Sequence, residues 1–277
     1  MTNDKTNNIS FVILILVMGA FYYNTIKWLI FSWIYNPYYS NGFVVIMLSG
    51  YMIWGLRKEV RSTEMKQSQI GLIFLTSGMI TYFIASIWTI RFLSGFSLIL
   101  TIYGAILFLY GWELTKKISF PILFLLLAIP IPFLDLATPP TQQISAVSSS
   151  SLANFIGIPV QREGLVLTMP TGKFEVGAEC SGLYSVISLL TTAIMFAYVL
   201  EGSLLAKLSI VISSIPLALA GNILRITSIL AVANRYGHDV AINYFHDFSN
   251  ILLFGTVLIG LFIVGRSFGR LKFKNIF

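Results

Sequence analysis

The stretch LSIVISSIPLALAGNILRITSILA, residues 208–231, decides the fold of this chain, and its single charged residue is Arg225. About 20 consecutive apolar residues make a helix that is long enough to cross the hydrocarbon core of a bilayer. Backbone N–H and C=O groups must be paired internally within lipid, and a helix achieves this by itself. Residues 208–231 therefore predict a transmembrane helix, and the other apolar stretches are interpreted by the same criterion.

The composition of the whole chain agrees with a membrane protein. Of its 277 residues, 56% are hydrophobic and only 10% are charged, with a mean hydropathy of +0.83. Soluble domains have about 25% charged residues, and disordered chains combine low hydrophobicity with high charge. Both classes are excluded. The net charge of +7 does not indicate nucleic-acid binding, because the basic residues are scattered over short loops and form no stripe.

The lengths of the apolar stretches and the positions of the charged residues between them predict an all-α polytopic membrane protein with about eight transmembrane helices. The chain shows no internal repeat and no low-complexity tract, so we expect one domain over residues 1–277. Lys27 and Glu113 are interpreted as anchors at the membrane interface. The predicted spans are Ile9–Phe31, Gly42–Leu56, Ile70–Ile90, Phe92–Trp112, Ile118–Leu134, Gly182–Leu200, Leu208–Ala231 and Ile251–Val264.

The distribution of basic residues predicts the orientation of these spans. Cytoplasmic loops of membrane proteins carry an excess of Lys and Arg. Alternate loops, counted with the two termini, collect Lys5, Arg57, Lys58, Arg61, Lys66, Lys116, Lys117, Lys207, Arg266, Arg270, Lys272 and Lys274. The opposite loops hold only Arg91, Arg162, Lys173 and Arg235. We therefore expect a multi-pass protein of the cell membrane with both termini in the cytoplasm.

The loop between the fifth and sixth spans, residues 135–180, is longer than the others and is expected outside the cytoplasm. Apolar residues at near-helical spacing in Thr141–Gly157 predict a short helix that lies at the membrane surface. In the second half, Leu165, Leu167 and Met169 alternate with polar residues before the turn PTGK, which predicts a β-hairpin. This hairpin leads directly to Cys180.

Cys180 is the only cysteine of the chain, so no intrachain disulfide can form. One interpretation is a small buried hydrophobe, the usual role of a free cysteine. The other is a nucleophile, because the thiolate is the reactive form and a helix N-terminus favours it. Ser181 and Gly182 would open the sixth span, and their free backbone N–H groups could face an oxyanion.

Arg225 lies within the seventh span, where a guanidinium costs several kcal/mol unless it faces protein or water. It either has a functional role or extends along the helix to the interface. Asn222 lies three residues earlier on the same helix face. Its amide would orient the guanidinium or bind a neighbouring span.

His246 precedes the eighth span, in the sequence Tyr244-Phe245-His246-Asp247. A lone interfacial histidine is commonly structural, and Asp247 is either its partner or solvated; His238 is expected to be solvated in its loop. The predicted topology changes this assessment, because it places Cys180, Arg225 and His246 at one membrane depth on the outer side. We therefore expect these three residues to form one thiol site, with neither a metal nor a cofactor.

Three segments together resemble the exosortase and archaeosortase family of membrane cysteine transpeptidases. They are Glu-Cys-Ser-Gly-Leu at 179–183, Asn-Ile-Leu-Arg-Ile at 222–226 and Phe-His-Asp at 245–247. The resemblance covers about residues 118–265, which it implies to be the catalytic core. The chain departs from the family at Asn250, where many members have glycine.

The resemblance implies that Cys180 forms an acyl-thioester and that Arg225 and His246 complete a catalytic triad. Arg225 would act as an acid or as an electrostatic clamp. Arginine is not ordinarily deprotonated, so the acid role would need a strongly perturbed guanidinium, whereas a cation that holds the thiolate and the oxyanion would not. His246 would donate to the leaving group or to the oxyanion. Asn222, Ser181, Gly182 and Asp247 would support the triad.

The same resemblance implies the partners of the chain. The substrates would be secreted proteins that end in a short motif, a transmembrane helix and a basic cluster. Cleavage between motif and helix would pass the protein to a glycan or a lipid at the cell surface, or to water. The alternatives are a polytopic transporter or a non-enzymatic subunit of exopolysaccharide export, neither of which needs a reactive thiol.

Overall fold

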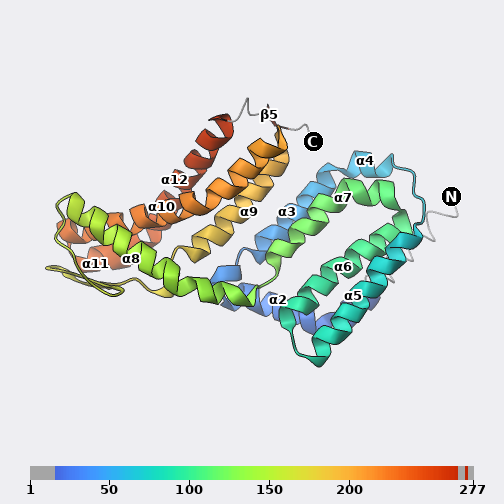
Figure 1. Cartoon of the computed structure of the whole chain (residues 1–277), viewed down its shortest axis with the longest axis horizontal. Helices are drawn as coiled ribbons and strands as arrows, with labels where there is room; N and C mark the ends of the chain where they lie inside the picture. The colour runs from blue at the N-terminus through green and yellow to red at the C-terminus, as the bar shows by residue number, and fades with distance from the viewer. Residues whose placement is uncertain (1–15, 268–271, 274–277) are drawn as a thin grey trace. The chain divides into compact units, whose positions relative to one another are not determined.

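The computed structural model describes residues 16–267 and 272–273, without the side chains of Phe133, Asp135, Glu179, Asp247 and Leu252. The described chain is mostly helical and forms two compact units that divide after Ile131 (Figure 1). The predicted catalytic core begins in the first unit, whereas Cys180, Arg225 and His246 all belong to the second. The assignment of residues 1–277 to a single domain stays a prediction.

The first unit consists of helices. Their bounds are α2 (Tyr23–Tyr35), the 3₁₀ turn η1 (Pro37–Tyr39), α3 (Gly42–Gly55), α4 (Arg57–Arg61), α5 (Gln69–Ile87), α6 (Arg91–Tyr110), α7 (Trp112–Phe124) and the 3₁₀ turn η2 (Leu125–Ala128). Helices α5 and α6 form an antiparallel pair whose backbones approach closely. A Cβ atom at Gly71 would overlap the backbone of Phe108, and one at Gly104 would overlap that of Leu75. Small residues permit this approach, which drives helix pairing within lipid.

Four described helices are long and apolar enough to cross a membrane: Gln69–Ile87, Arg91–Tyr110, Leu204–Tyr236 and Phe248–Ser267 within α12. The chain is therefore a multi-pass membrane protein. Helices α3 and α7, at the second and fifth predicted spans, have only 14 and 13 residues, or about 20 Å at 1.5 Å per residue. The first predicted span, Ile9–Phe31, begins outside the described residues. The count of eight transmembrane helices stays a prediction.

The fifth predicted span, Ile118–Leu134, does not form one helix. Helix α7 ends at Phe124 and passes into η2, and a second 3₁₀ helix begins at Pro132. Proline has no backbone N–H and disfavours the helical conformation of the residue before it. Pro130 and Pro132 therefore interrupt the helix, and the boundary between the two units falls at this point.

The second unit contains the remaining helices and all the described strands. Their bounds are η3 (Pro132–Ala137), α8 (Thr138–Phe155), β1 (Gln161–Glu163), β2 (Val166–Met169), β3 (Gly172–Glu175), the 3₁₀ turn η4 (Ala178–Cys180), α9 (Leu183–Val199), β4 (Leu200–Glu201), α10 (Leu204–Tyr236), α11 (His238–Val240), the π-helical turn η5 (Ala241–Phe245), α12 (His246–Ser267) and β5 (Lys272–Phe273). Strands β1, β2 and β3 form an antiparallel sheet in chain order, and β4 pairs with β5.

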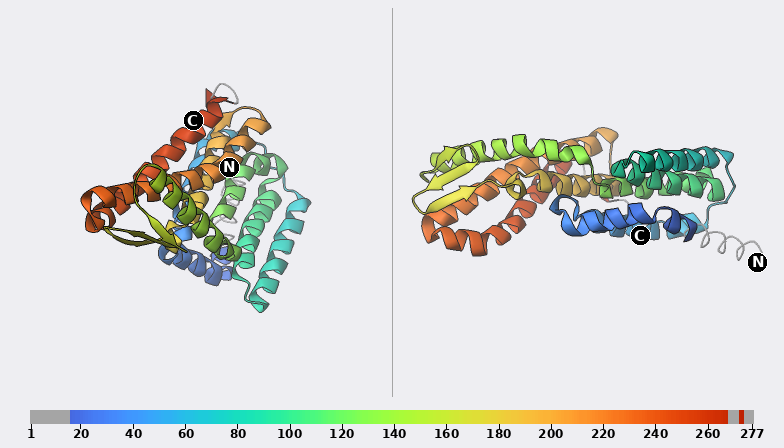
Figure 2. Two further views of the ribbon diagram at one scale, coloured as in Figure 1. Left: turned by 60° about the vertical axis from the view of Figure 1, so that its left-hand side comes forward. Right: turned by 90° about the horizontal axis from the view of Figure 1, so that it is seen from below.

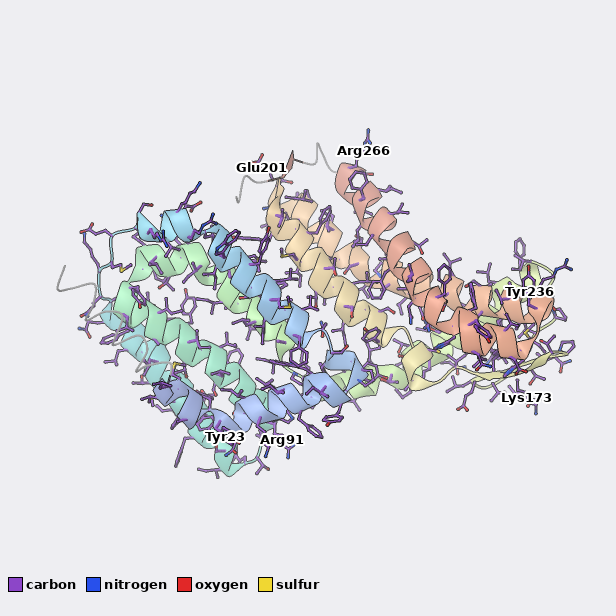
Figure 3. All side chains as sticks on the ribbon, turned by 180° about the vertical axis from the view of Figure 1, so that it is seen from behind. Tyr23, Arg91, Lys173, Glu201, Tyr236 and Arg266 are labelled. Carbon is purple, nitrogen blue, oxygen red and sulfur yellow. The ribbon has the colours of Figure 1, made fainter. Side chains whose placement is uncertain are left out.

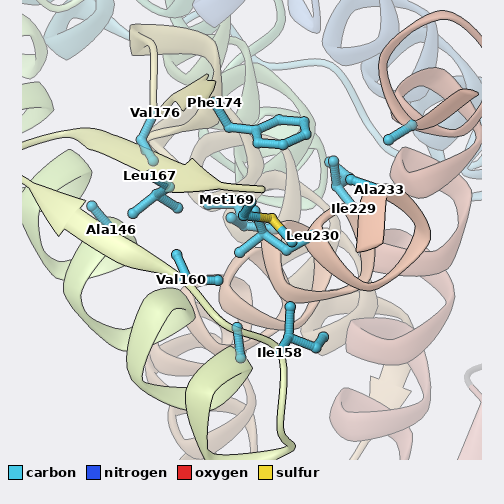
Figure 4. Packing of buried hydrophobic residues seen from close by; sticks show 13 residues of the cluster. Ala146, Ile158, Val160, Leu167, Met169, Phe174, Val176, Ile229, Leu230 and Ala233 are labelled. Carbon is cyan, nitrogen blue, oxygen red and sulfur yellow. The ribbon is translucent and has the colours of Figure 1, made fainter. Parts of the chain in front are cut away.

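Helix α10 carries Asn222 and Arg225. Its 33 residues extend about 50 Å, which exceeds the thickness of about 30 Å of the hydrocarbon core. Beyond Arg225, its residues Ile229, Leu230 and Ala233 pack against Leu167 and other side chains of the sheet (Figure 4). Helix α8 covers the same sheet, as the two views of Figure 2 show. The C-terminal third of α10 is thus held by the hairpin that precedes Cys180.

Candidate active site

Cys180 ends the 3₁₀ turn η4, which joins the sheet to α9. Its N–H donates to the carbonyl of Gly177 at 2.9 Å, and the N–H of Ser181 donates to the carbonyl of Ala178 at 3.2 Å. The half-buried side chain packs against the apolar cluster formed by the sheet, α8 and α10. The hairpin therefore fixes the position of the thiol.

The expected oxyanion donors are only partly available in this conformation. The amide of Ser181 is already engaged within η4, as is that of Cys180. The hydroxyl of Ser181 accepts from the N–H of Leu183, the first residue of α9, at 3.2 Å. The amides of Cys180 and Ser181 are therefore not free to face a ligand in this conformation.

Asn222 holds the cysteine turn to α10. Its Nδ2 donates to the carbonyl of Cys180 at 2.9 Å and to the hydroxyl of Ser145 at 3.0 Å. Ser145, on α8, donates in turn to the carbonyl of Ser181 at 3.2 Å. Both side chains are fully buried. Of the two roles expected for Asn222, the contacts match a bond to a neighbouring segment and not orientation of the guanidinium of Arg225.

The amide oxygen of Asn222 is buried and has no hydrogen-bond partner among the described residues. An unpaired buried acceptor costs about 1–3 kcal/mol. Such a group is retained in a native structure only with a reason.

Gly182 occupies the N-cap position of α9 with φ +82°. Residues with a Cβ atom rarely adopt this left-handed backbone conformation. A Cβ there would also lie 3.0–3.2 Å from Asn222. We expect Gly182→Ala to destabilise the protein by about 1–2 kcal/mol through strain and displacement of Asn222. Thermal unfolding of the detergent-solubilised protein measures this effect.

Gly177→Ala is the matched control for Gly182→Ala. Gly177 belongs to the same turn, has φ −63° and has open space where a Cβ would be added. It should leave the unfolding temperature nearly unchanged. Equal unfolding temperatures for the two variants would contradict the strain that we assign to Gly182.

Arg225 is only 4% exposed, and its guanidinium is held by two side chains of α12. Its Nε donates to the hydroxyl of Ser249 at 2.9 Å, and its Nη2 lies 3.1 Å from Nε2 of His246. A buried charge is tolerated only when it is hydrogen-bonded. The interpretation that Arg225 extends to the interface does not fit this burial.

His246 is the first residue of α12 and follows the π-helical turn η5. Such turns are rare and are frequent at functional sites. Its Nε2 lies 4.0 Å from the sulfur of Cys180. Arginine can only donate hydrogen bonds, so Nε2 carries no proton while Arg225 donates to it. Nε2 therefore lies within reach of both the guanidinium and the thiol.

Ser249 is a residue of the site that the sequence analysis missed. Its fully buried hydroxyl accepts from Arg225 and donates to the backbone carbonyl of His246. A residue three positions after a histidine in a helix lies on the same face, so this spacing was a usable signal. Ser145 was also missed, since nothing in its serine-rich segment points to Cys180.

His238 is not part of this site. Its ring packs on Phe174 at 4.7 Å between centroids, and its Nε2 lies 3.3 Å from the carbonyl of Lys173. The expectation that it is solvated is met in part, because its side chain is 36% exposed while the ring packs on β3. Lys173 and the C-terminal residue of α10, Tyr236, lie at the same end of this unit (Figure 3). The side chains of Glu179 and Asp247 lie outside the described part of the structure.

Comparison with protein families identifies the chain. The family model of the transmembrane exosortases matches residues 33–263. The chain belongs to the transmembrane exosortase family. The predicted family is thereby confirmed, and the match extends well beyond the residues that carry the resemblance. No curated protein and no solved structure matches this exosortase.

Proposed function

We propose that this exosortase is a cysteine transpeptidase that removes C-terminal sorting signals from secreted proteins. The observation that supports this most is the chain of contacts from the buried guanidinium of Arg225 through Nε2 of His246 to the thiol of Cys180. A nucleophile, a proton acceptor and a fixed positive charge then meet in one place. This is the set of groups that acyl transfer through a thiol requires.

In the first step, the proton of the Cys180 thiol passes to Nε2 of His246, and the thiolate attacks the carbonyl carbon of the substrate. The contact of 4.0 Å shortens when the substrate binds, as is common for catalytic hydrogen bonds. Once Nε2 is protonated, Arg225 can no longer donate to it. The guanidinium then turns to the negative charge on the carbonyl oxygen.

In the second step, the carbon–nitrogen bond breaks, and His246 returns its proton to the departing amine. The fragment with the transmembrane helix leaves, and the secreted protein stays on Cys180 as a thioester. The nucleophile of an acceptor attacks this thioester and releases the thiol. The acceptor is a glycan or lipid of the cell surface, and water in its place gives hydrolysis.

The positions of the basic residues support the orientation that this function needs. Both termini would lie in the cytoplasm, and Cys180, with the loop of residues 135–180, would face the exterior. A thiol at that surface can reach a peptide bond just above a substrate helix. No cofactor takes part in these steps.

The function is tested with a secreted reporter that ends in a short motif, a transmembrane helix and a basic cluster. A host without an exosortase of its own would express the reporter with this chain. We expect the reporter to lose its C-terminal helix and reach the surface or the medium. A matching reporter that lacks the motif should stay intact. A tail that is never cleaved, although the chain is folded in the membrane, would exclude the proposal.

Ser249 is proposed as a positioning residue, because it holds both Arg225 and the backbone of His246. We expect Ser249→Ala to lower kcat of reporter cleavage about tenfold, with KM nearly unchanged, since small misplacements of catalytic groups are costly. Ser249→Thr keeps a hydroxyl and should recover most of the rate.

Ser228→Ala is the control for Ser249→Ala. The hydroxyl of Ser228 donates to the carbonyl of Arg225 within α10 and does not touch the guanidinium. Its loss should leave kcat within about twofold. Equal rates for Ser249→Ala and Ser228→Ala would remove the positioning role from Ser249.

A further inference from the structure

We propose that the first unit binds the phosphate head group of a membrane lipid in a cavity at the turn between α5 and α6. This site is separate from the thiol site and does not depend on the transpeptidase function. The ligand chemistry is a phosphate ester that carries acyl or other long apolar chains. Lys27 and Arg91 would hold the phosphate.

The cavity has a volume of about 490 Å³, within the range of ordinary ligand sites. It is lined by α2, by the C-terminal turn of α5 and by the N-terminal turn of α6. Lys27 extends from α2, and Arg91 is the first residue of α6. Figure 3 shows Arg91 near the N-terminal part of α2, where Tyr23 is labelled.

The charges around this cavity are not balanced. Its lining includes two cations but neither aspartate nor glutamate. The ion pairs of the described residues are Lys66 with Glu64 and His238 with Asp239, so neither Lys27 nor Arg91 has an acidic partner there. The N-terminus of α6 is the positive end of its dipole, which disfavours a cation such as Arg91. An anion from outside the chain would relieve this repulsion.

Hydrogen-bond donors complete a phosphate site. Thr25, Ser86 and Thr89 supply hydroxyls to the lining, and Trp28 and Tyr82 form aromatic walls. Thr89 has φ +54°, and it is the one described residue other than glycine with a positive φ. Backbone strain of this kind concentrates at functional sites.

The position in the chain favours a lipid over a soluble phosphate. Helices α5 and α6 are both candidate membrane spans, so the short turn of residues 88–90 lies at a membrane surface, at the depth of lipid head groups. The neighbouring side chains of Phe31, Phe83 and Ile87 are 60%, 66% and 62% exposed. In a membrane these side chains face acyl chains. A lipid can therefore place its phosphate in the cavity and its chains along this surface.

The competing interpretation is that Lys27 and Arg91 are independent interfacial anchors. Each cation would then attract any anionic head group weakly, without a saturable site. The built cavity predicts one saturable site that requires both cations. Binding measurements distinguish these two cases.

The test uses the full chain in a neutral maltoside detergent, with dioctanoyl phosphatidic acid as the probe. Native mass spectrometry counts bound lipid, and calorimetry gives Kd. We expect one site per chain, and we expect Lys27→Gln with Arg91→Gln to raise Kd at least about tenfold. Lys58→Gln with Arg61→Gln is the matched control. It also removes one lysine charge and one arginine charge, but from α4, whose residues do not line the cavity.

Two further probes identify the part of the ligand that matters. Dioctanoylglycerol, which lacks the phosphate, should not occupy the site. Inorganic phosphate should displace the lipid only at concentrations at least about 100-fold higher. Equal displacement by inorganic phosphate would overturn the lipid assignment. The site itself would be overturned if phosphatidic acid binding never saturates, or if its Kd rises equally in the two double variants.

A second measurement does not depend on the folding of a variant. In the wild-type chain, saturating phosphatidic acid should slow acetylation of Lys27 by an amine-reactive reagent at least about fivefold. Lys58, which does not line the cavity, should react at its original rate. Equal rates at Lys27 with and without lipid would contradict the proposal. A negative result for lipid binding would not bear on reporter cleavage by the thiol site. The two proposals are therefore tested separately.

Discussion

Replacement of Cys180 by alanine is expected to abolish cleavage of the sorting-signal reporter. The variant loses the only thiol of the chain, so no thioester can form. Loss of the nucleophile in enzymes with covalent intermediates lowers kcat by about 10³-fold or more. Cleavage is measured by gel mobility of the reporter, and the amount of chain in the membrane by immunoblot.

Cys180→Ser separates the transpeptidase from the two alternative functions. Its hydroxyl is a much weaker nucleophile than a thiol in this arrangement, so cleavage should also fall below detection. A transporter, or a structural subunit of an export machine, would tolerate serine at this position. Reporter cleavage at the wild-type rate by Cys180→Ala would exclude a role of the thiol in the reaction.

Replacement of Arg225 by glutamine is expected to lower kcat about 10²- to 10³-fold, the cost of removing one preorganised donor to an oxyanion. Glutamine is shorter and uncharged, so it neither stabilises the oxyanion nor reaches both Ser249 and His246. KM should change less, because in the proposed mechanism the charge acts mainly in the transition state. Rates from purified protein and a synthetic reporter peptide give this comparison.

Arg225→Lys tests whether charge alone is sufficient. The guanidinium uses Nε for Ser249 and Nη2 for His246 at the same time. A lysine ammonium lacks this rigid fork, so we expect the variant to stay at least about tenfold slower than the wild type. The matched control is Arg235→Lys, near the C-terminus of α10, where the side chain is exposed. Full activity of Arg225→Lys would contradict the proposed two-sided contact.

Several features of the site follow from the order of residues along the chain. Cys180 lies just ahead of one predicted span, Arg225 lies within the next, and His246 precedes the one after that. Antiparallel helices alternate in direction, so these three positions occur at one end of a bundle. This argument predicts that the side chains approach one another, and the structure brings all three together.

Other features could not be predicted, because they depend on side-chain packing. The hydrogen bonds from Asn222 to the cysteine turn and to Ser145 join residues that are far apart in the sequence. Hydrophobic length does not indicate which face of α8 meets α10. It also does not show that α10 continues beyond the bilayer thickness to carry the hairpin, since the polar residues at its end resemble those of a loop.

The interruption of the fifth predicted span coincides with two prolines of the sequence. Pro130 and Pro132 ended the helical part of the fifth predicted span, although the apolar character continues to Leu134. Hydropathy measures the environment that a segment prefers and does not measure its backbone conformation. Pro130 and Pro132 thus mark the end of the helical part, whereas Pro121 lies inside α7 without ending it.

The intact mass of the protein during turnover tests the central claim most directly. The full chain is mixed with a synthetic reporter peptide and quenched with acid at short times. We predict an adduct with the mass of the N-terminal fragment, which hydroxylamine removes and which Cys180→Ala never forms. Because the chain has one cysteine, any thioester must be on Cys180. Complete cleavage of the peptide with no hydroxylamine-sensitive adduct at any quench time would contradict the account.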